Sequence, residues 1–109
     1  MASIDDLKAL GLRVGVIEGV EVHEGARKPM YKLTVDLGPE AGKRLIVAGI
    51  GDIYTKEQLV GRRVVCVANL EPKMIAGVES QGMLLAADDG TSVSLLMPDK
   101  EMPAGSTIR

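Results

Sequence analysis

The sequence has very few aromatic residues: its 109 residues include no Phe, no Trp and only two Tyr. The core must therefore be built from Val, Leu, Ile, Met and Ala. A single cysteine excludes an internal disulfide and favours a reducing compartment, so we expect a cytoplasmic protein. No stretch reaches the ~18 apolar residues of a membrane span, and the first residues lack the basic start of a signal peptide. We expect no membrane partner.

The residues that enzymes use are also scarce. His23 is the only histidine, and Cys66, between two valines, is expected to be buried and inert. One histidine and one cysteine cannot supply the usual zinc ligands. The glycines form neither a G-x-G-x-x-G nor a Walker pattern before a helix. We therefore predict no catalytic residue, no metal and no cofactor.

Charge is low and unevenly distributed. The net charge of −2 argues mildly against nucleic acid as a partner. Between residues 13 and 75, however, there are ten basic and eight acidic residues, so the acidic excess lies at the two ends of the chain. Apolar residues make up 46% and charged residues 26%, which excludes a disordered chain. The sequence therefore allows a basic face on a globular protein.

The first residues predict a short capped helix. Ser3 is a typical N-cap, apolar residues at 4, 7 and 10 follow at helical spacing, and Gly11 ends the pattern. A helix this short is marginal alone, so we expect it to dock on its own domain or on a second copy.

Strand patterns fill most of the remaining chain. Residues 12–22 are β-branched with two internal glycines, which predicts a strand with a bulge or a sharp bend. The expected strands are 12–22, 31–37, 44–50, 62–69, 82–87 and 92–97. Turns are expected at 38–43 and 88–90, one helical turn capped by Thr55 between the third and fourth strands, and a loop-like tail. The pattern predicts an all-β fold, a five-stranded OB-fold Greek-key barrel, with residues 1–109 as one domain and a core of about 12–97.

Two motifs carry a family resemblance: V-A-N-L-E-P-K at residues 67–73 and G-V-E-S-Q-G-M-L-L-A at residues 77–86. With R-V-G-V-I and V-D-L-G earlier in the chain, they make it resemble the tRNA-binding-domain family. That family includes the C-terminal appendage of methionyl-tRNA synthetases, freestanding dimeric relatives and the CsaA proteins. The resemblance runs from Arg13 to about Met97 and implies an OB barrel with a macromolecular partner.

The resemblance leaves the partner open. The stretch E-G-A-R-K-P at residues 24–29 is closer to the CsaA branch, which is described as an export-related chaperone, whereas S-Q-G-M-L-L-A-A is the synthetase-like form. Our first hypothesis is tRNA binding through phosphate contacts and RNA shape. The alternative is a chaperone that binds unfolded polypeptide through an apolar, methionine-lined groove. A third reading is a module that recruits an aminoacyl-tRNA synthetase.

The candidate RNA-binding residues are cations and polar residues near the expected groove. They are Arg13, Lys28, Lys32, Lys43, Arg44, Asn69, Lys73, Ser80, Gln81 and Met83. Ordinary alternatives exist for each: a turn cap for Asn69, turn residues at 80 and 81, a core position for Met83, and solvated lysines.

Both branches of the family also imply a homodimer, made by the N-terminal helix and the C-terminal strands. The apolar residues that a monomeric barrel would not need are Ile4, Leu7, Leu10, Leu95, Met97, Met102 and Ile108.

Overall fold

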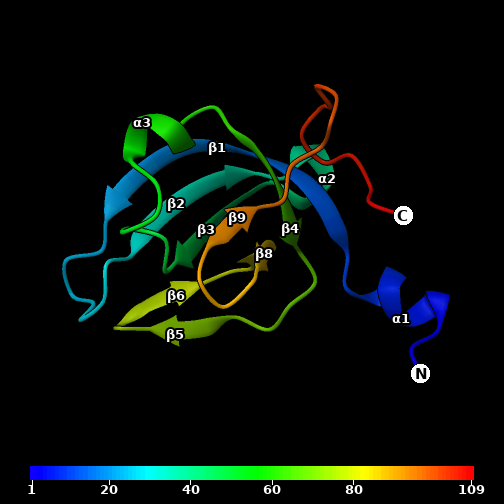
Figure 1. Cartoon of the computed structure of the whole chain (residues 1–109). Coiled ribbons are helices and arrows are strands. Elements are labelled where there is room, and N and C mark those ends of the chain that lie inside the picture. Colours follow the sequence, from blue (N-terminus) through cyan, green and yellow to red (C-terminus); the bar gives the residue numbers. More distant parts are fainter.

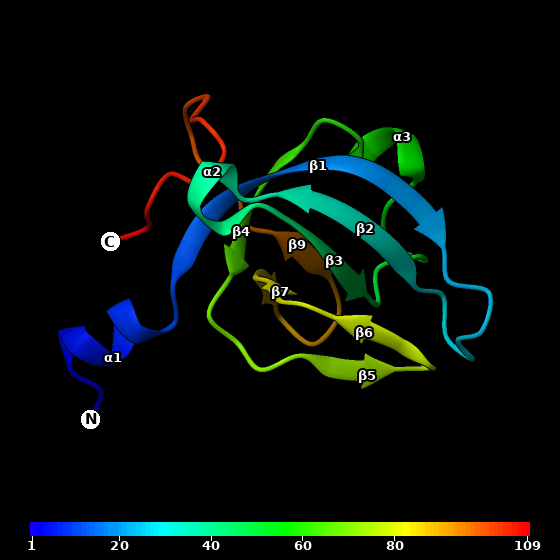
Figure 2. The ribbon, with the colours of Figure 1, turned by 180° about the vertical axis from the view of Figure 1, so that it is seen from behind.

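The computed structural model describes all residues from 1 to 109, and its centre is a strongly curved antiparallel sheet (Figures 1 and 2). The strand order is β3-β2-β1-β4-β7. The five strands are β1 (Leu12–Val22), β2 (Tyr31–Asp36), β3 (Lys43–Ala48), β4 (Arg63–Val67) and β7 (Met83–Leu84). The central position of β1, between β2 and β4, confirms the Greek-key connectivity expected for an OB barrel.

The length and bend of β1 let one strand serve both halves of the barrel. Its first half pairs with β4 and its second half with β2, and the register with β2 shifts between Ile17 and Gly19. That shift is the predicted bulge, which bends the strand. Gly15 lies where the barrel wall is tightest: a Cβ there would come within 2.6 Å of the Val35 side chain. Glycine is therefore required at this position by packing.

The inside of the barrel is aliphatic, as the composition requires. Its fully buried side chains are Ile17, Leu33, Val35, Leu37, Ile46, Leu59, Val64 and Cys66. The alternation predicted for residues 31–37 is confirmed, with odd-numbered residues inside and Lys32, Thr34 and Asp36 on the outer face.

Hydrogen bonds between β3 and residues 80–81, from main chain and side chain, close the barrel where regular strand pairing ends. Gln81 N donates to Leu45 O at 2.7 Å, and Leu45 N donates back to Gln81 Oε1 at 3.0 Å. One step along, Val47 N donates to Ser80 Oγ at 3.0 Å. We call this junction of β3 with residues 80–81 the seam. It replaces the missing ladder between the two edges of the curved sheet.

Two small hairpins follow β4. The first, β5 (Lys73–Ile75) with β6 (Val78–Ser80), was not predicted from the sequence. Its turn places Ala76 at φ 49° and Gly77 at φ 84°, so both central residues are left-handed, as in a type I′ turn. Alanine rarely adopts that conformation, so the dipeptide A-G predicts a hairpin turn less clearly than N-G does. The second hairpin, β8 (Ala86–Asp88) with β9 (Val93–Leu95), turns at the predicted D-D-G.

The helices are short. α1 (Ile4–Ala9) begins at Ser3, as predicted, with a reciprocal capping box between Ser3 and Asp6. α3 (Lys56–Leu59) begins at the predicted Thr55 cap and covers one end of the barrel. α2 (Gly38–Ala41) forms where only a turn was expected, because a proline in its first turn starts it and Gly42 ends it. None of the helices has the length or apolar character to cross a membrane.

The C-terminal tail lies along the first half of β1. Val14 N donates to Ser106 O, Gly105 N donates to Val14 O, and Arg13 forms a bridge with Thr107. The tail therefore extends the sheet on the side of β1 that β2 leaves free. The sequence predicted only a loop here.

Candidate nucleic-acid interface

One end of the barrel gathers three segments that are distant in sequence: loop 23–30, the β5–β6 hairpin and α3 (Figure 1). Loop 23–30 connects β1 to β2, and the hairpin belongs to the connection between β4 and the last barrel strand. In OB folds these two connections and the face of the second and third strands hold oligonucleotides. We call this region the loop end. Both chain termini lie at the opposite end.

The loop end carries four exposed cations that form no ion pair: Arg27, Lys28, Lys56 and Lys73. We call them the loop-end cations. Lys28 and Lys73 were predicted as RNA ligands, whereas Arg27 and Lys56 were missed. The sequence signal for Arg27 was its place beside Lys28 in a polar loop. Lys56 gave no such signal, because only the fold brings α3 to this end.

A hollow of about 610 Å³ lies among these segments, lined by Glu21, Val22, His23, Glu24, Gly25, Lys32, Lys56 and Val78. A smaller groove of about 390 Å³ continues across the outer sheet face and shares Glu21 and Lys32 with the hollow. Gly19 and Thr34 line that groove, so small side chains keep it open. The charged lining of the hollow consists of two carboxylates and two lysines, so it carries no net charge.

Two predicted ligands, Lys32 and Lys43, point outward from β2 and β3 but are paired with glutamates of β1. Lys32 Nζ lies 3.7 Å from Glu21 Oε2, and Lys43 Nζ lies 3.0 Å from Glu18 Oε1. The hydrogen bond that Lys43 donates to Glu18, together with the negative charge of that carboxylate, raises the pKa of Lys43. Exposed ion pairs of this kind contribute little free energy. A phosphate can therefore replace the glutamate as the partner of either lysine.

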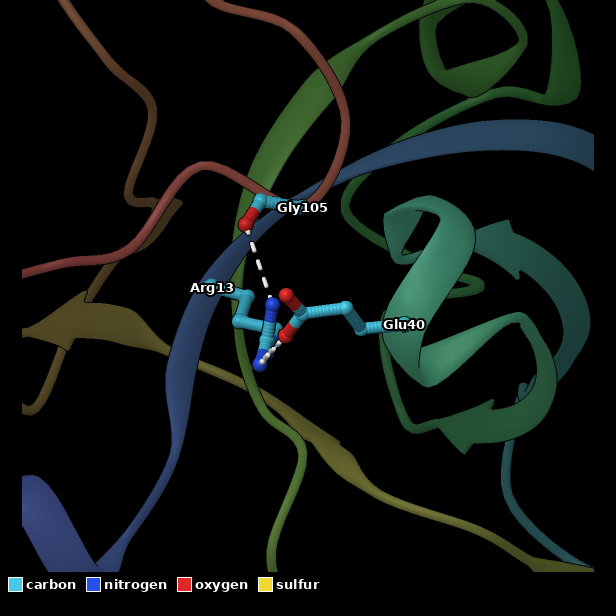
Figure 3. Close-up of polar contacts among 3 residues, drawn as sticks. All are labelled: Arg13, Glu40 and Gly105. Carbon is cyan, nitrogen blue, oxygen red and sulfur yellow. Dashed lines mark hydrogen bonds and ion pairs between the residues drawn. The ribbon is translucent and has the colours of Figure 1, made fainter.

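The guanidinium groups of Arg13 and Arg44 are held within the chain. Arg13 Nη1 donates to Gly105 O at 3.2 Å and its Nη2 to Glu40 Oε2 at 3.0 Å, which ties β1 to the tail and to α2 (Figure 3). Arg44 donates from Nη1 to the carbonyl oxygens of Ala68 and Gln81 at 3.1 and 3.2 Å. Arg44 therefore belongs to the seam. These contacts leave the two arginines little donor capacity for RNA.

The predicted polar residues between β4 and β7 are also bonded internally. Ser80 is buried, accepts from Val47 N and donates to Gly82 O at 3.2 Å. Asn69 Nδ2 donates to Ala9 O at 2.6 Å and so satisfies the C-terminal end of α1. Contacts from Ser80, Gln81 and Asn69 to RNA stay predictions, since each side chain already serves the fold.

Apolar side chains are exposed next to the seam. Met74 on β5 and Met83 on β7 are 62% and 55% exposed, and Leu70 between β4 and β5 is also exposed. Met83 is therefore a surface residue, as its assignment to a binding surface requires. Flexible, polarisable methionines suit adaptable contacts.

Tyr31 belongs to the core, and Tyr54 packs against it. Tyr31 is buried and its hydroxyl donates to Tyr54 O at 2.8 Å. The hydroxyl of Tyr54 accepts from Leu95 N at 2.9 Å, a bond that lowers its pKa, and its ring lies 5.0 Å from the Arg62 guanidinium. The Tyr31 ring therefore offers no face on which an unpaired base could stack, and Arg62 lies over one face of the partly buried Tyr54 ring.

The single cysteine and the single histidine do not form a pair. Cys66 faces the barrel interior, and burial raises the pKa of its thiol to about 12. His23 lies at the far end of β1, where its ring bonds to Ile75 O. The thiol and the imidazole thus belong to separate environments.

Residues 12–107 match the family described as "Putative tRNA binding domain". The methionine–tRNA ligase of Thermococcus onnurineus is 54% identical over 105 residues, which are 96% of this chain and 14% of the ligase. The enzyme of the same name from Methanothrix thermoacetophila is 56% identical over 105 residues, again 96% of this chain and 15% of the ligase. The chain thus spans about one seventh of the length of these curated relatives.

Solved structures of similar length share the whole fold. A crystal structure of the CsaA chaperone protein from Picrophilus torridus superposes with a TM-score of 0.91 at 34% identity and covers 100% of both chains. A MetRS-related protein from Pyrococcus horikoshii gives a TM-score of 0.88 at 35% identity, covering 100% of this chain and 98% of that one. The chain is therefore similar both to methionyl-tRNA synthetase relatives and to CsaA proteins, the two branches that its motifs predicted.

Proposed function

Because the chain belongs to the tRNA-binding domain family, we propose that it binds tRNA without catalysis, through the loop end and the outer face of β2 and β3. The observation that carries this proposal is the set of four exposed, unpaired loop-end cations at the position where OB barrels hold oligonucleotides. Cations without an internal partner are the ones that a phosphate can engage at lowest cost.

The other candidate residues divide by their contacts. Lys32 and Lys43 add to the phosphate-binding surface by exchanging a glutamate for a phosphate. Arg13, Arg44, Asn69, Ser80 and Gln81 hold the surrounding backbone in place. Since one of the two tyrosines is buried and the other is partly buried under Arg62, recognition depends mainly on the shape and charge of structured RNA.

The protein is proposed to act as a homodimer in the cytoplasm, with its whole length as one binding domain. α1 buries none of its residues, and Ile4 is 62% exposed beside the exposed Leu7 and Leu10. Leu96, Met97 and Met102 are exposed after β9, whereas Leu95, expected at the dimer contact, is buried in the core. A second copy would cover these apolar residues, and two weak RNA sites would gain affinity by acting together.

The dimer is tested by sedimentation with L7D. The expected result is a dimer for the native chain at tens of micromolar and a monomer for L7D. I53D is the matched control, since Ile53 is apolar and exposed to a similar extent, 39% against 37% for Leu7, but lies between β3 and α3. A native monomer at that concentration contradicts the proposal.

Binding is tested by titrating the protein with unfractionated tRNA at about 50 and about 200 mM salt. If phosphates dominate, the affinity falls steeply between the two conditions. Absence of binding at low salt contradicts the tRNA proposal.

A chaperone function is the second candidate, supported by the similarity to CsaA structures and by the exposed Leu70, Met74 and Met83. Unfolded segments need apolar surface of this kind. Suppression of a denatured client's aggregation, together with no tRNA binding at low salt, would favour it. Recruitment of an aminoacyl-tRNA synthetase is compatible with either function, and the ligase activity of the longer relatives is not proposed for this chain.

A further inference from the structure

His23 is a buried residue in an exposed loop. Only 5% of its surface is accessible, whereas Val22 and Glu24 on either side are exposed. An imidazole removed from water needs a hydrogen-bond partner, and the ring finds one outside its own loop. Its Nε2 lies 3.0 Å from the carbonyl oxygen of Ile75, the last residue of β5. Since a carbonyl only accepts, Nε2–H is the donor.

The main chain of His23 shapes the loop itself. Its N–H donates to Met30 O at 2.9 Å, and its carbonyl accepts from Ala26 N at 3.2 Å. One residue therefore fixes the start of the loop, its return to β2 and its distance from the hairpin.

The hairpin has little else to hold its tip. β6 lies along β3 at the seam, but the outer edge of β5 pairs with no strand. The bond from His23 to Ile75 is the one hydrogen bond between loop 23–30 and the hairpin. Gly25 packs at the same place, because a Cβ there would lie 3.3 Å from the His23 ring and 3.5 Å from Ala76 O.

The two segments that this bond joins carry three of the four loop-end cations: Arg27 and Lys28 on the loop, and Lys73 on the hairpin. We infer that His23 is a positioning residue for RNA binding, whose bond to Ile75 O sets the spacing between the two cations of the loop and Lys73 of the hairpin. This inference rests on the proposed tRNA binding. Its physical basis is preorganisation: segments already fixed lose less conformational freedom when RNA binds.

The test compares H23A with H23Q, whose side-chain amide can donate to Ile75 O in place of the imidazole. In the free protein, amide hydrogen exchange in residues 24–30 and 74–78 should accelerate in H23A, while the core strands stay protected. H23Q should restore protection in both segments. Global acceleration in H23A, with no restoration in H23Q, would overturn the inference.

Binding provides the second readout. H23A should weaken the affinity for unfractionated tRNA about tenfold, the effect of one lost hydrogen bond, and H23Q should recover most of it. The slope of log affinity against log salt should stay as in the native protein, since no phosphate contact is removed. K28A is the matched comparison and should lower that slope by about one.

The outcomes separate the two proposals. If the native protein binds no tRNA, the proposed function fails, and faster exchange confined to the two segments still shows the connection between them. If the native protein binds tRNA and H23A binds it equally well, the inference fails while the function stands. A reduced salt slope in H23A would make His23 a phosphate contact and would also overturn the positioning role.

Discussion

Leu45 and Gln81 are joined by two hydrogen bonds across the seam, one between their main chains at 2.7 Å and one from Leu45 N to the Gln81 side chain at 3.0 Å. A side-chain amide thus takes the place of a neighbouring strand. This pair, with Val47 and Ser80 beside it, turns an open curved sheet into a nearly closed barrel.

Removing the amide should weaken the seam. In Q81A the Leu45 N–H loses its acceptor, and we expect unfolding in urea to show a loss of about 1–3 kcal/mol. Q81E is the matched control, since its carboxylate still accepts from Leu45 N and lies near the Arg44 guanidinium. Equal losses in the two variants would show that the seam does not depend on this acceptor.

Arg44 and Lys43 are neighbours with opposite roles. R44A removes the donors to Ala68 O and Gln81 O, so the free energy of unfolding should fall by about 1–3 kcal/mol. K43A breaks only an exposed ion pair and should leave stability nearly unchanged. Chemical denaturation measures both. A larger loss of stability in K43A than in R44A would show that Lys43, and not Arg44, supports the seam.

This contrast also decides which variant probes RNA binding. Reversing Lys43 alone, in K43E, should lower the affinity for tRNA in a folded protein. A double reversal of residues 43 and 44 would mix that effect with damage to the seam.

The tail is held by a close approach of two glycines. A Cβ on Gly105 would lie 2.8 Å from Leu37 O and 2.9 Å from Gly38 Cα, and Gly105 has φ 89°. Gly90 has the same φ with nothing within 4 Å. G90A therefore measures the backbone cost alone, about 1–2 kcal/mol, and G105A should cost roughly 1–3 kcal/mol more. Equal thermal shifts in the two variants would contradict this packing.

The Cys66 thiol should be unreactive in the folded protein. Burial raises its pKa to about 12, so the thiolate is roughly one part in ten thousand near pH 8. The disulfide reagent DTNB should label it only as fast as the protein unfolds, and at once in denaturant. Stoichiometric labelling within seconds under native conditions would show that β4 is exposed.

Much of the fold was readable from local patterns. The alternation of residues 31–37, the glycine-rich bent strand at 12–22 and the caps at Ser3 and Thr55 are short-range signals, and each predicted the element that forms. The β5–β6 hairpin was missed because its left-handed turn uses an alanine. The seam was not predictable, since its bonds join residues more than thirty positions apart.

The candidate site was predicted less completely than the fold, for a physical reason. Composition identifies cations but not their partners, and partners decide which cations are free. Arg13 and Arg44 resemble Lys28 and Lys73 in the sequence, yet the fold gives both arginines carbonyl acceptors. Lys56 becomes a candidate only because α3 folds over the loop end.

The central claim is that the loop-end cations hold tRNA by its phosphates. The direct measurement is the salt dependence of tRNA affinity for the triple variant R27A/K28A/K73A, compared with K8A/K100A/R109A. The control removes the same charge from exposed positions in α1 and in the chain after β9. We predict that the slope of log affinity against log salt falls by about three in the first variant and stays native in the second. Equal slopes in the two variants, or a larger loss in the control, would contradict the account.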